Sequence, residues 1–189
     1  MKENESLIDK TILVSMNEIN ISTDKSPIIA TSSLATCIGI LLYNENQKKA
    51  MIYHVTANQN GNYEEQAIKI YSELILFLFN NNLEEEMMKY MIIPGAYSYY
   101  YNIQTPNQVA NELLKIFDIE SKKFTKFESN EIPIDAIRLH KETKSLEFAF
   151  NAYNEKFVTS KLFPNDLNYT IPEIQKNKIN ISSHHNHTS

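Results

Sequence analysis

The chain has 189 residues, 42% of them hydrophobic and 22% charged, which is typical of a soluble globular protein rather than a disordered or membrane-spanning one. Its formal net charge is -5 and Arg138 is its single arginine, so it lacks the clustered basic side chains that nucleic-acid binding requires. We therefore expect no nucleic-acid partner and no stable insertion into a membrane.

The length fits one domain with a short appendage. The hydrophobic pattern weakens beyond about Asn154, so we expect a domain over residues 1–154 and a partly disordered C-terminal extension over residues 155–189. The N-terminal residues are polar and mixed in charge, unlike a secretory signal. We expect a cytoplasmic, monomeric protein, with signal-less export by a specialised system left open.

The expected elements follow from the period of the apolar residues. Spacing of three and four predicts a helix over residues 64–81, and Thr105 followed by Pro106 predicts the capped start of a second helix. Alternating or short apolar runs predict strands over residues 11–16, 27–33, 37–43, 50–56, 88–93, 122–127, 134–140 and 145–150. This order favours an α+β fold of mixed layers with antiparallel hairpins and two main helices.

The single cysteine, Cys37, excludes an internal disulfide. If the strands around residues 44–49 pair so that partner numbers sum to about 91, Cys37 lies across from His54. An imidazole beside a thiol can take its proton and produce the nucleophilic thiolate, and a third polar group can orient the ring. Thr31 is our candidate for that group, with Ser32 and Ser33 as alternatives. The competing interpretation is a small buried cysteine of the core.

The segment from Thr31 to Asn44, with TSSLATCIGILLYN, and the segment AMIYHV that begins at Ala50 resemble the CheD family of chemoreceptor glutamine deamidases. Fainter similarity continues through residues 62–69, through Pro94-Gly95-Ala96 and through the stretch 137–143. The same type of catalytic triad occurs in the deamidating toxins Burkholderia lethal factor and the cytotoxic necrotizing factors. The resemblance covers roughly residues 11–150 and implies a CheD-like sandwich.

The resemblance implies a cysteine-dependent protein-glutamine deamidase that needs no cofactor and no metal. Cys37 would be the nucleophile, His54 the base and Thr31 the orienting residue, and the backbone N–H groups of Thr36 and Cys37 would stabilise the oxyanion. We expect Ser33 and Tyr97 to contact the substrate, which is a protein with an exposed glutamine, either a chemoreceptor or a host protein. The expected Cys37–His54 pair also predicts a thiol pKa below its ordinary value.

The chain departs from the family pattern in its glycines. Ala35 and Thr36 replace the small residues before the cysteine, and residues 129–133 replace a glycine-rich stretch. These changes predict altered substrate recognition. They also leave open a second function, an inactive CheD-like scaffold that binds a signalling partner.

Histidines outside this segment receive a structural interpretation. His184, His185 and His187 lie in a polar tail that we expect to be disordered rather than a metal site, and His140 lies on a predicted strand.

Overall fold

The computed structural model describes residues 7–83 and 87–169. Along the chain the elements are β1 (Thr11–Val14), β2 (Glu18–Ile21), β3 (Ile28–Leu34), β4 (Cys37–Asn44), β5 (Lys49–Thr56), α2 (Tyr63–Asn80), β6 (Met88–Pro94), α3 (Tyr97–Tyr100), α4 (Thr105–Ile119), β7 (Phe124–Lys126), the 3-10 turn η1 (Ser129–Glu131), β8 (Ile137–His140), β9 (Ser145–Asn151), β10 (Lys156–Phe157), α5 (Thr159–Leu162) and β11 (Leu167–Tyr169). The predicted α+β class is confirmed.

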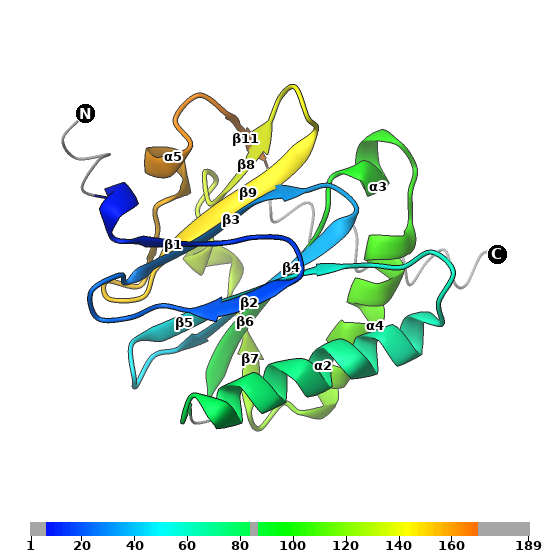
Figure 1. Cartoon of the computed structure of the whole chain (residues 1–189), viewed down its shortest axis with the longest axis horizontal. Coiled ribbons are helices and arrows are strands. Elements are labelled where there is room, and N and C mark those ends of the chain that lie inside the picture. The colour runs from blue at the N-terminus through cyan, green and yellow to red at the C-terminus, as the bar shows by residue number, and fades with distance from the viewer. Residues whose placement is uncertain (1–6, 84–86, 170–189) are drawn as a thin grey trace.

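The strands form two sheets that pack face to face. Sheet A has the order β1-β3-β9-β8-β11, with β10 also paired to β9, and sheet B has the order β2-β5-β4-β6-β7. Their pairs are antiparallel except for β1 with β3 and β6 with β7. Helices α2 and α4 cover the outer face of sheet B, so the layers run sheet A, sheet B, helices (Figure 1).

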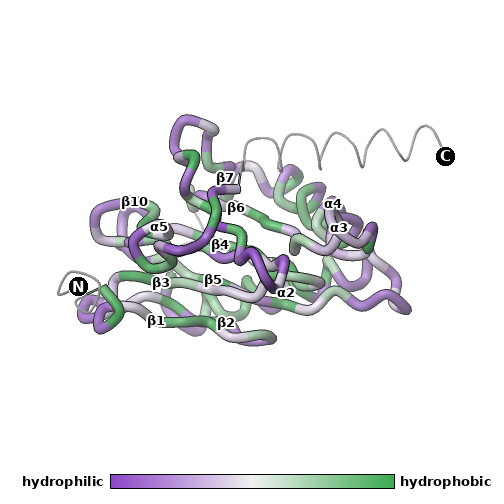
Figure 2. The backbone as a smooth tube through the Cα atoms, turned by 90° about the horizontal axis from the view of Figure 1, so that it is seen from above, coloured by the Kyte–Doolittle hydropathy of each residue, from purple (hydrophilic) through white to green (hydrophobic). Residues whose placement is uncertain are grey.

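Two apolar layers hold the fold together. One lies between the sheets and includes Ile29, Leu41 and Phe148, and the other lies between sheet B and the helices and includes Ile40 and Leu74. Strand β4 serves both because successive side chains point to opposite faces, and all of its residues are buried. In Figure 2 hydrophobic stretches follow β6 while hydrophilic residues mark many of the loops.

Helix α2 forms close to where the sequence predicts a helix. Asn62 caps it by accepting a hydrogen bond from the backbone N–H of Glu65 at 3.0 Å. Buried side chains recur at intervals of three and four on the face toward sheet B, namely Ala67, Ile70, Leu74 and Leu78. This apolar face fixes the orientation of α2 against β5.

The predicted start of α4 is wrong by one position. Gln104 occupies the N-cap and makes no side-chain hydrogen bond to the helix, while Thr105 is the first helical residue and Pro106 the second. The Thr105 side chain is buried in the fold, 7% exposed. Thr105 therefore packs into the fold as the first residue of the helix instead of capping it, although threonine is also a common cap.

The fold continues past the expected domain boundary at residue 154. Strand β10 pairs with β9, β11 pairs with β8, and Val158 between them is buried. At least residues 156–169 therefore form strands of sheet A or pack against that sheet, rather than forming a separate extension. The predicted disordered stretch and His184, His185 and His187 lie outside the described residues.

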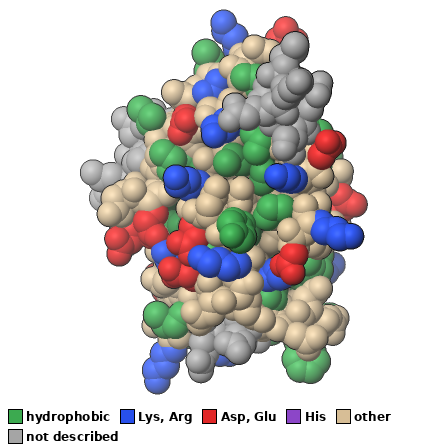
Figure 3. All heavy atoms as spheres, turned by 90° about the vertical axis from the view of Figure 1, so that its left-hand side faces the viewer, with side chains coloured by type: hydrophobic (Ala, Val, Ile, Leu, Met, Phe, Trp, Pro, Cys, Tyr) green, Lys and Arg blue, Asp and Glu red, His purple; other side chains and the backbone are tan. Residues whose placement is uncertain are grey.

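The surface carries both charge signs. On the face in Figure 3, lysine and arginine side chains lie among acidic ones instead of gathering in a broad basic patch. Among the residues that the structure describes, no helix is both long and apolar enough to cross a membrane.

Candidate functional site

The three residues singled out in the sequence come from three strands that meet between the sheets. Thr31 lies on β3 of sheet A, Cys37 begins β4 of sheet B, and His54 lies on β5 beside it. All three are buried, with exposed fractions of 0%, 2% and 1%. Because β3 and β4 are consecutive but belong to different sheets, the chain crosses from one sheet to the other just before Cys37.

The predicted register of the β4–β5 hairpin is wrong by two residues. Cys37 pairs with Thr56, and His54 pairs with Gly39, so partner numbers sum to 93. His54 is still on the same face as Cys37, because a two-residue shift preserves the alternation of side chains. The two are diagonal neighbours, a relation in which Cβ atoms lie roughly 7 Å apart.

Thr31 makes the contact that orients the histidine. Its hydroxyl oxygen lies 2.8 Å from Nδ1 of His54 and 2.7 Å from the carbonyl oxygen of Val14. A threonine hydroxyl has one proton, and a carbonyl can only accept, so that proton goes to Val14. Thr31 must then accept from Nδ1–H, which leaves Nε2 of His54 unprotonated.

The free nitrogen of His54 is aimed into the layer between the sheets. Nε2 is buried and has no hydrogen-bond partner among the described residues. An unpaired buried acceptor is costly in a folded protein and is a recurrent feature of catalytic groups. Together with the tautomer fixed by Thr31, it makes His54 a candidate proton acceptor on the face that Cys37 shares.

The thiol of Cys37 is protonated in this environment. Burial raises its pKa, and the hydroxyls of Thr56 and Thr36 lower it by smaller amounts. The Sγ–H group donates a weak hydrogen bond to Thr56 Oγ1 at 3.9 Å. The expected depressed thiol pKa is therefore wrong, because desolvation outweighs the contacts that favour a thiolate.

The imidazole of His54 is neutral for the same reason. Burial lowers its pKa below the ordinary value of 6.5, and no carboxylate contributes to the shift. Thiol and imidazole are thus both uncharged, and Nε2 of His54 makes no hydrogen bond to the sulfur, which bonds Thr56 instead. The two can act as nucleophile and general base only if they come within reach of each other and the proton moves during attack, as in a serine triad.

The bend before Cys37 is held by the end of β6 and the start of α3. The N–H groups of Gly95, Ala96 and Tyr97 donate to the carbonyl oxygens of Cys37, Leu34 and Ala35, at 2.8, 3.1 and 3.1 Å. A Cβ on Gly95 would lie 2.1 Å from the Ala35 carbonyl oxygen. Only glycine permits this close approach, so Gly95 fixes the backbone that leads into Cys37.

The other predicted site residues lie at the rim of this bend. Ser33 is exposed, with a φ of 63° in an irregular part of β3. Tyr97 is half-buried, packs edge to face on Tyr101 and is joined through its N–H to Ala35. Thr36 touches the Cys37 sulfur through its hydroxyl. Ser32, the alternative to Thr31, is half-buried, and Thr31 makes the contact with His54.

Three residues that shape the candidate site were not predicted from the sequence. Val14 supplies the carbonyl that sets the tautomer, Thr56 covers the sulfur, and Asn17 holds Thr56 in place. The Asn17 side-chain oxygen accepts from the Thr56 N–H at 3.1 Å and from its hydroxyl at 2.9 Å. Asn17 has a φ of 61°, which asparagine tolerates better than most residues. An asparagine in a turn was the available signal, and it is too common to be decisive.

Metal ligands do not gather in the described ranges. No group of three or more His, Cys, Asp or Glu side chains there is arranged to hold an ion. His140 lies on β8, where its Nδ1 is 3.0 Å from the Thr143 hydroxyl in the turn that follows.

A scan against models of known protein families finds no match to this chain, and a search of curated proteins finds none either.

Proposed function

We propose that this protein is a cysteine-dependent protein-glutamine deamidase that uses Cys37, His54 and Thr31. The observation that carries the proposal is the Thr31–His54 contact. It leaves an unprotonated, unpartnered Nε2 on the face that also bears the thiol. The resemblance of residues 31–44 and 50–55 to CheD deamidases supports the choice of a carboxamide substrate.

In the first half of the reaction, Sγ of Cys37 attacks the side-chain carboxamide carbon of a glutamine. The thiol proton passes to Nε2 of His54 as the S–C bond forms, and backbone N–H groups at Thr36 and Cys37 stabilise the oxyanion. Collapse of the tetrahedral intermediate breaks the C–N bond. His54 returns its proton to the departing nitrogen, which leaves as ammonia.

In the second half, water hydrolyses the thioester. His54 takes a proton from the attacking water, the S–C bond breaks, and the proton returns to the sulfur. The net reaction consumes one water and one glutamine side chain, and it produces one glutamate side chain and one ammonia. Thr31 acts as a positioning residue throughout, because it holds the imidazole through Nδ1.

The burial of the thiol means that this mechanism requires a local movement before the substrate can bind. Cys37 is 2% exposed and Thr56 lies on its sulfur, so a glutamine can reach the thiol only after Thr56 moves. Thr56 is itself exposed, and Asn17 is the residue that restrains its hydroxyl and N–H. Binding of the target protein would supply that displacement.

The same observation favours a second candidate function, a catalytically inactive scaffold. A buried thiol with a raised pKa is also what a structural cysteine shows. In that case the face around Tyr97 and the bend before Cys37 would bind a signalling partner without chemistry.

The deciding experiment measures conversion of glutamine to glutamate. Purified protein is incubated with a panel of receptor cytoplasmic fragments and host proteins rich in exposed glutamines. Peptide mass spectrometry reads the gain of about 1 Da that replacing a carboxamide with a carboxylate causes. A deamidase converts one site within the panel, and Cys37→Ser and His54→Ala each abolish the conversion.

Two outcomes contradict the proposal. Equal conversion by wild type and Cys37→Ser would remove the cysteine mechanism. Binding of a panel member with micromolar affinity, without conversion at any ratio of enzyme to target, would assign the scaffold function instead. The class of protein converted separates a receptor target from a host target.

A further inference from the structure

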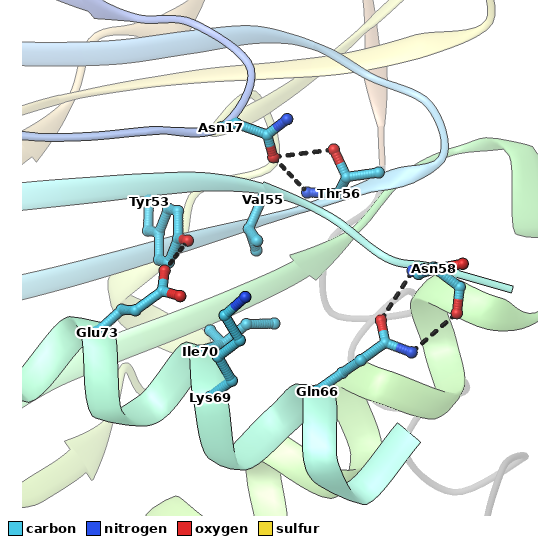
Figure 4. A pocket seen from close by; sticks show the side chains of 9 residues that line it. All are labelled: Asn17, Tyr53, Val55, Thr56, Asn58, Gln66, Lys69, Ile70 and Glu73. Carbon is cyan, nitrogen blue, oxygen red and sulfur yellow. Dashed lines mark hydrogen bonds between the residues drawn. The ribbon is translucent and has the colours of Figure 1, made fainter. Parts of the chain in front are cut away.

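A pocket of about 270 Å³ lies between β5 and α2, next to the candidate site. Its walls come from the end of β5, from the first three turns of α2 and from Asn17 in the turn between β1 and β2 (Figure 4). The volume exceeds that of one side chain, so the pocket has room for a ligand group together with water.

Thr56 connects this pocket to the thiol. Thr56 lines the pocket, and its hydroxyl oxygen is also the atom that accepts from Sγ–H of Cys37 at 3.9 Å. Asn17, the other lining residue at this end, holds Thr56 through two hydrogen bonds. Whatever displaces Thr56 from the sulfur therefore acts at the mouth of the pocket.

The pocket carries two opposite charges, one turn apart on α2. Glu73 accepts a hydrogen bond from the Tyr53 hydroxyl. Lys69 makes no ion pair or hydrogen bond among the described residues, although Glu65 and Glu73 are each four positions away, and Figure 4 draws its side chain among the pocket residues. The Gln66 amide bonds the backbone of Asn58 through its oxygen and one of its N–H groups. The charged groups that line the pocket are thus one ammonium and one carboxylate, beside the side-chain amides of Asn17, Asn58 and Gln66.

A primary carboxamide matches this pair better than the alternatives. Its carbonyl oxygen can accept from Lys69 while its N–H groups donate to Glu73, and it is neutral like the pocket as a whole. A carboxylate would meet Lys69 but lie against Glu73, and an ammonium would meet Glu73 but lie against Lys69. An aliphatic side chain would offer a hydrogen bond to neither charge.

We propose, on the basis of the proposed deamidase function, that this pocket binds a second glutamine or asparagine side chain of the target segment. Tyr53, which bonds Glu73, and Thr56, which touches the thiol, are three residues apart on β5. Three strand residues span about 10 Å. The thiol and the pocket lie on opposite faces of sheet B, and Thr56 at the end of β5 is the residue they share. An extended segment that places one glutamine at Cys37 and passes Thr56 therefore reaches Lys69 and Glu73 with a residue about three positions away.

The experiment uses the full chain with Cys37→Ser, so that no peptide is consumed. The probes are the blocked peptides acetyl-Gln-Ala-Ala-Xaa-N-methylamide and acetyl-Xaa-Ala-Ala-Gln-N-methylamide, where Xaa is Gln, Glu, Lys or Ala. Backbone and methyl NMR shifts report binding, with Val55 and Ile70 as pocket signals. The Gln peptide in one of the two orders is expected to shift these signals and to bind about fivefold more tightly than its Glu and Ala counterparts.

Variants of Lys69 and Glu73 then test which charge causes the preference for the Gln peptide. Glu73→Gln keeps an acceptor for Tyr53 but removes the charge, and it is expected to reduce the preference for Gln over Glu to within about twofold. Lys69→Met is expected to weaken the Gln peptide about fivefold. The exposed ion pair of Glu112 and Lys115 on α4 offers the matched controls Glu112→Gln and Lys115→Met, which should change neither value.

The inference is overturned if the shifts map away from the pocket, or if the four peptides bind equally. It is also overturned if a Glu or Lys peptide binds best. These results are separate from the fate of the proposed function, which is read from ammonia release by the wild-type protein. Selective binding without ammonia release supports the pocket and contradicts the enzyme, and release without selective binding does the reverse.

Discussion

The hydroxyl of Thr31 on one sheet lies 2.8 Å from Nδ1 of His54 on the other. Both residues are buried, and the contact joins the two sheets of the sandwich by a polar interaction inside a largely apolar layer. Because Thr31 also donates to Val14, the contact specifies which ring nitrogen carries the proton. The same pair therefore has a structural role and a chemical one, and variants can separate them.

Thr31→Val is expected to remove the tautomer preference while keeping the shape of the side chain. The Val14 carbonyl and Nδ1 of His54 would both lose a partner, so the free energy of unfolding should fall by about 1–3 kcal/mol. Urea unfolding measures this loss, and the ¹⁵N shifts of the imidazole report the tautomer. Wild type should show protonated Nδ1.

Thr31→Ser is the matched control, because it retains the hydroxyl and deletes only a methyl group. It should keep the Nδ1–H tautomer and any deamidase activity. A wild-type histidine protonated at Nε2 in the neutral state would contradict the arrangement of hydrogen bonds described above.

His54 predicts an acid-sensitive component of stability. Burial holds its folded pKa below 6.5, the ordinary value, so the unfolded chain binds a proton that the folded chain does not. Stability contributed by neutral His54 is therefore present above pH 6.5 and is lost as pH falls toward the folded pKa. The slope approaches about 1.4 kcal/mol per pH unit within that window.

Urea unfolding between about pH 7.5 and 5 measures this component, with the ordinary histidine pKa as the centre of the range. His54→Gln should remove it, whereas His140→Gln, at a half-buried position on β8, should leave it unchanged. Identical pH profiles for wild type and His54→Gln would show that His54 does not titrate abnormally.

Removal of the Asn17 side chain should expose the thiol. Asn17→Gly tolerates the φ of 61° and deletes both hydrogen bonds that hold Thr56 over Cys37. Alkylation of Cys37 at neutral pH is expected to be slow in wild type, because burial raises the thiol pKa, and several-fold faster in the variant.

Asn82→Gly is a suitable control for this measurement. Asn82 also has a positive φ, 54°, and it follows the far end of α2 rather than the site. Its replacement should leave the alkylation rate as in wild type. Equal rates for all three proteins would show that Asn17 does not control access to the sulfur.

Gly95→Ala is expected to destabilise the fold by about 1–3 kcal/mol, since the added Cβ would meet the backbone of Ala35 at 2.1 Å. The displaced bend would also disturb Cys37, so alkylation should change with stability. Gly61→Ala is the control, because there the nearest atom is the end of the flexible Gln66 side chain, at 2.6 Å. Urea midpoints compare the two, and a similar loss in both would contradict the role given to Gly95.

The longer elements were predictable from sequence, whereas the register of the central hairpin was not. Alternation placed β4 and β5 on the correct faces, but it leaves shifts of two residues equivalent. The loop after β4 decides between them. There the Asn44 side chain accepts from the N–H of Gln47 at 2.8 Å, and Lys48 adopts a φ of 53°, so the ladder closes at Asn44 and Lys49.

Short elements escaped prediction for a different reason. Strand β2 alternates between exposed and half-buried residues at a sheet edge, and β10 and β11 have two and three residues. None of them is long enough to establish a period. Among the candidate site residues, Thr31 and His54 were predicted from their spacing to Cys37 and from the resemblance noted in the sequence. Val14 contributes only its carbonyl, which any residue could supply.

The Val14 carbonyl gives strand β1 a role in deciding which nitrogen of His54 carries the proton. A chain shortened to begin at β3 would retain Cys37, His54 and Thr31, and Thr31 would still pair with β9. Without Val14, however, its hydroxyl proton would be free to turn toward Nδ1 of His54, and the ring proton would then reside on Nε2, where it blocks proton uptake. Shortened versions of this protein would therefore keep the side chains of Cys37, His54 and Thr31 and lose the placement of protons on which the proposed mechanism depends.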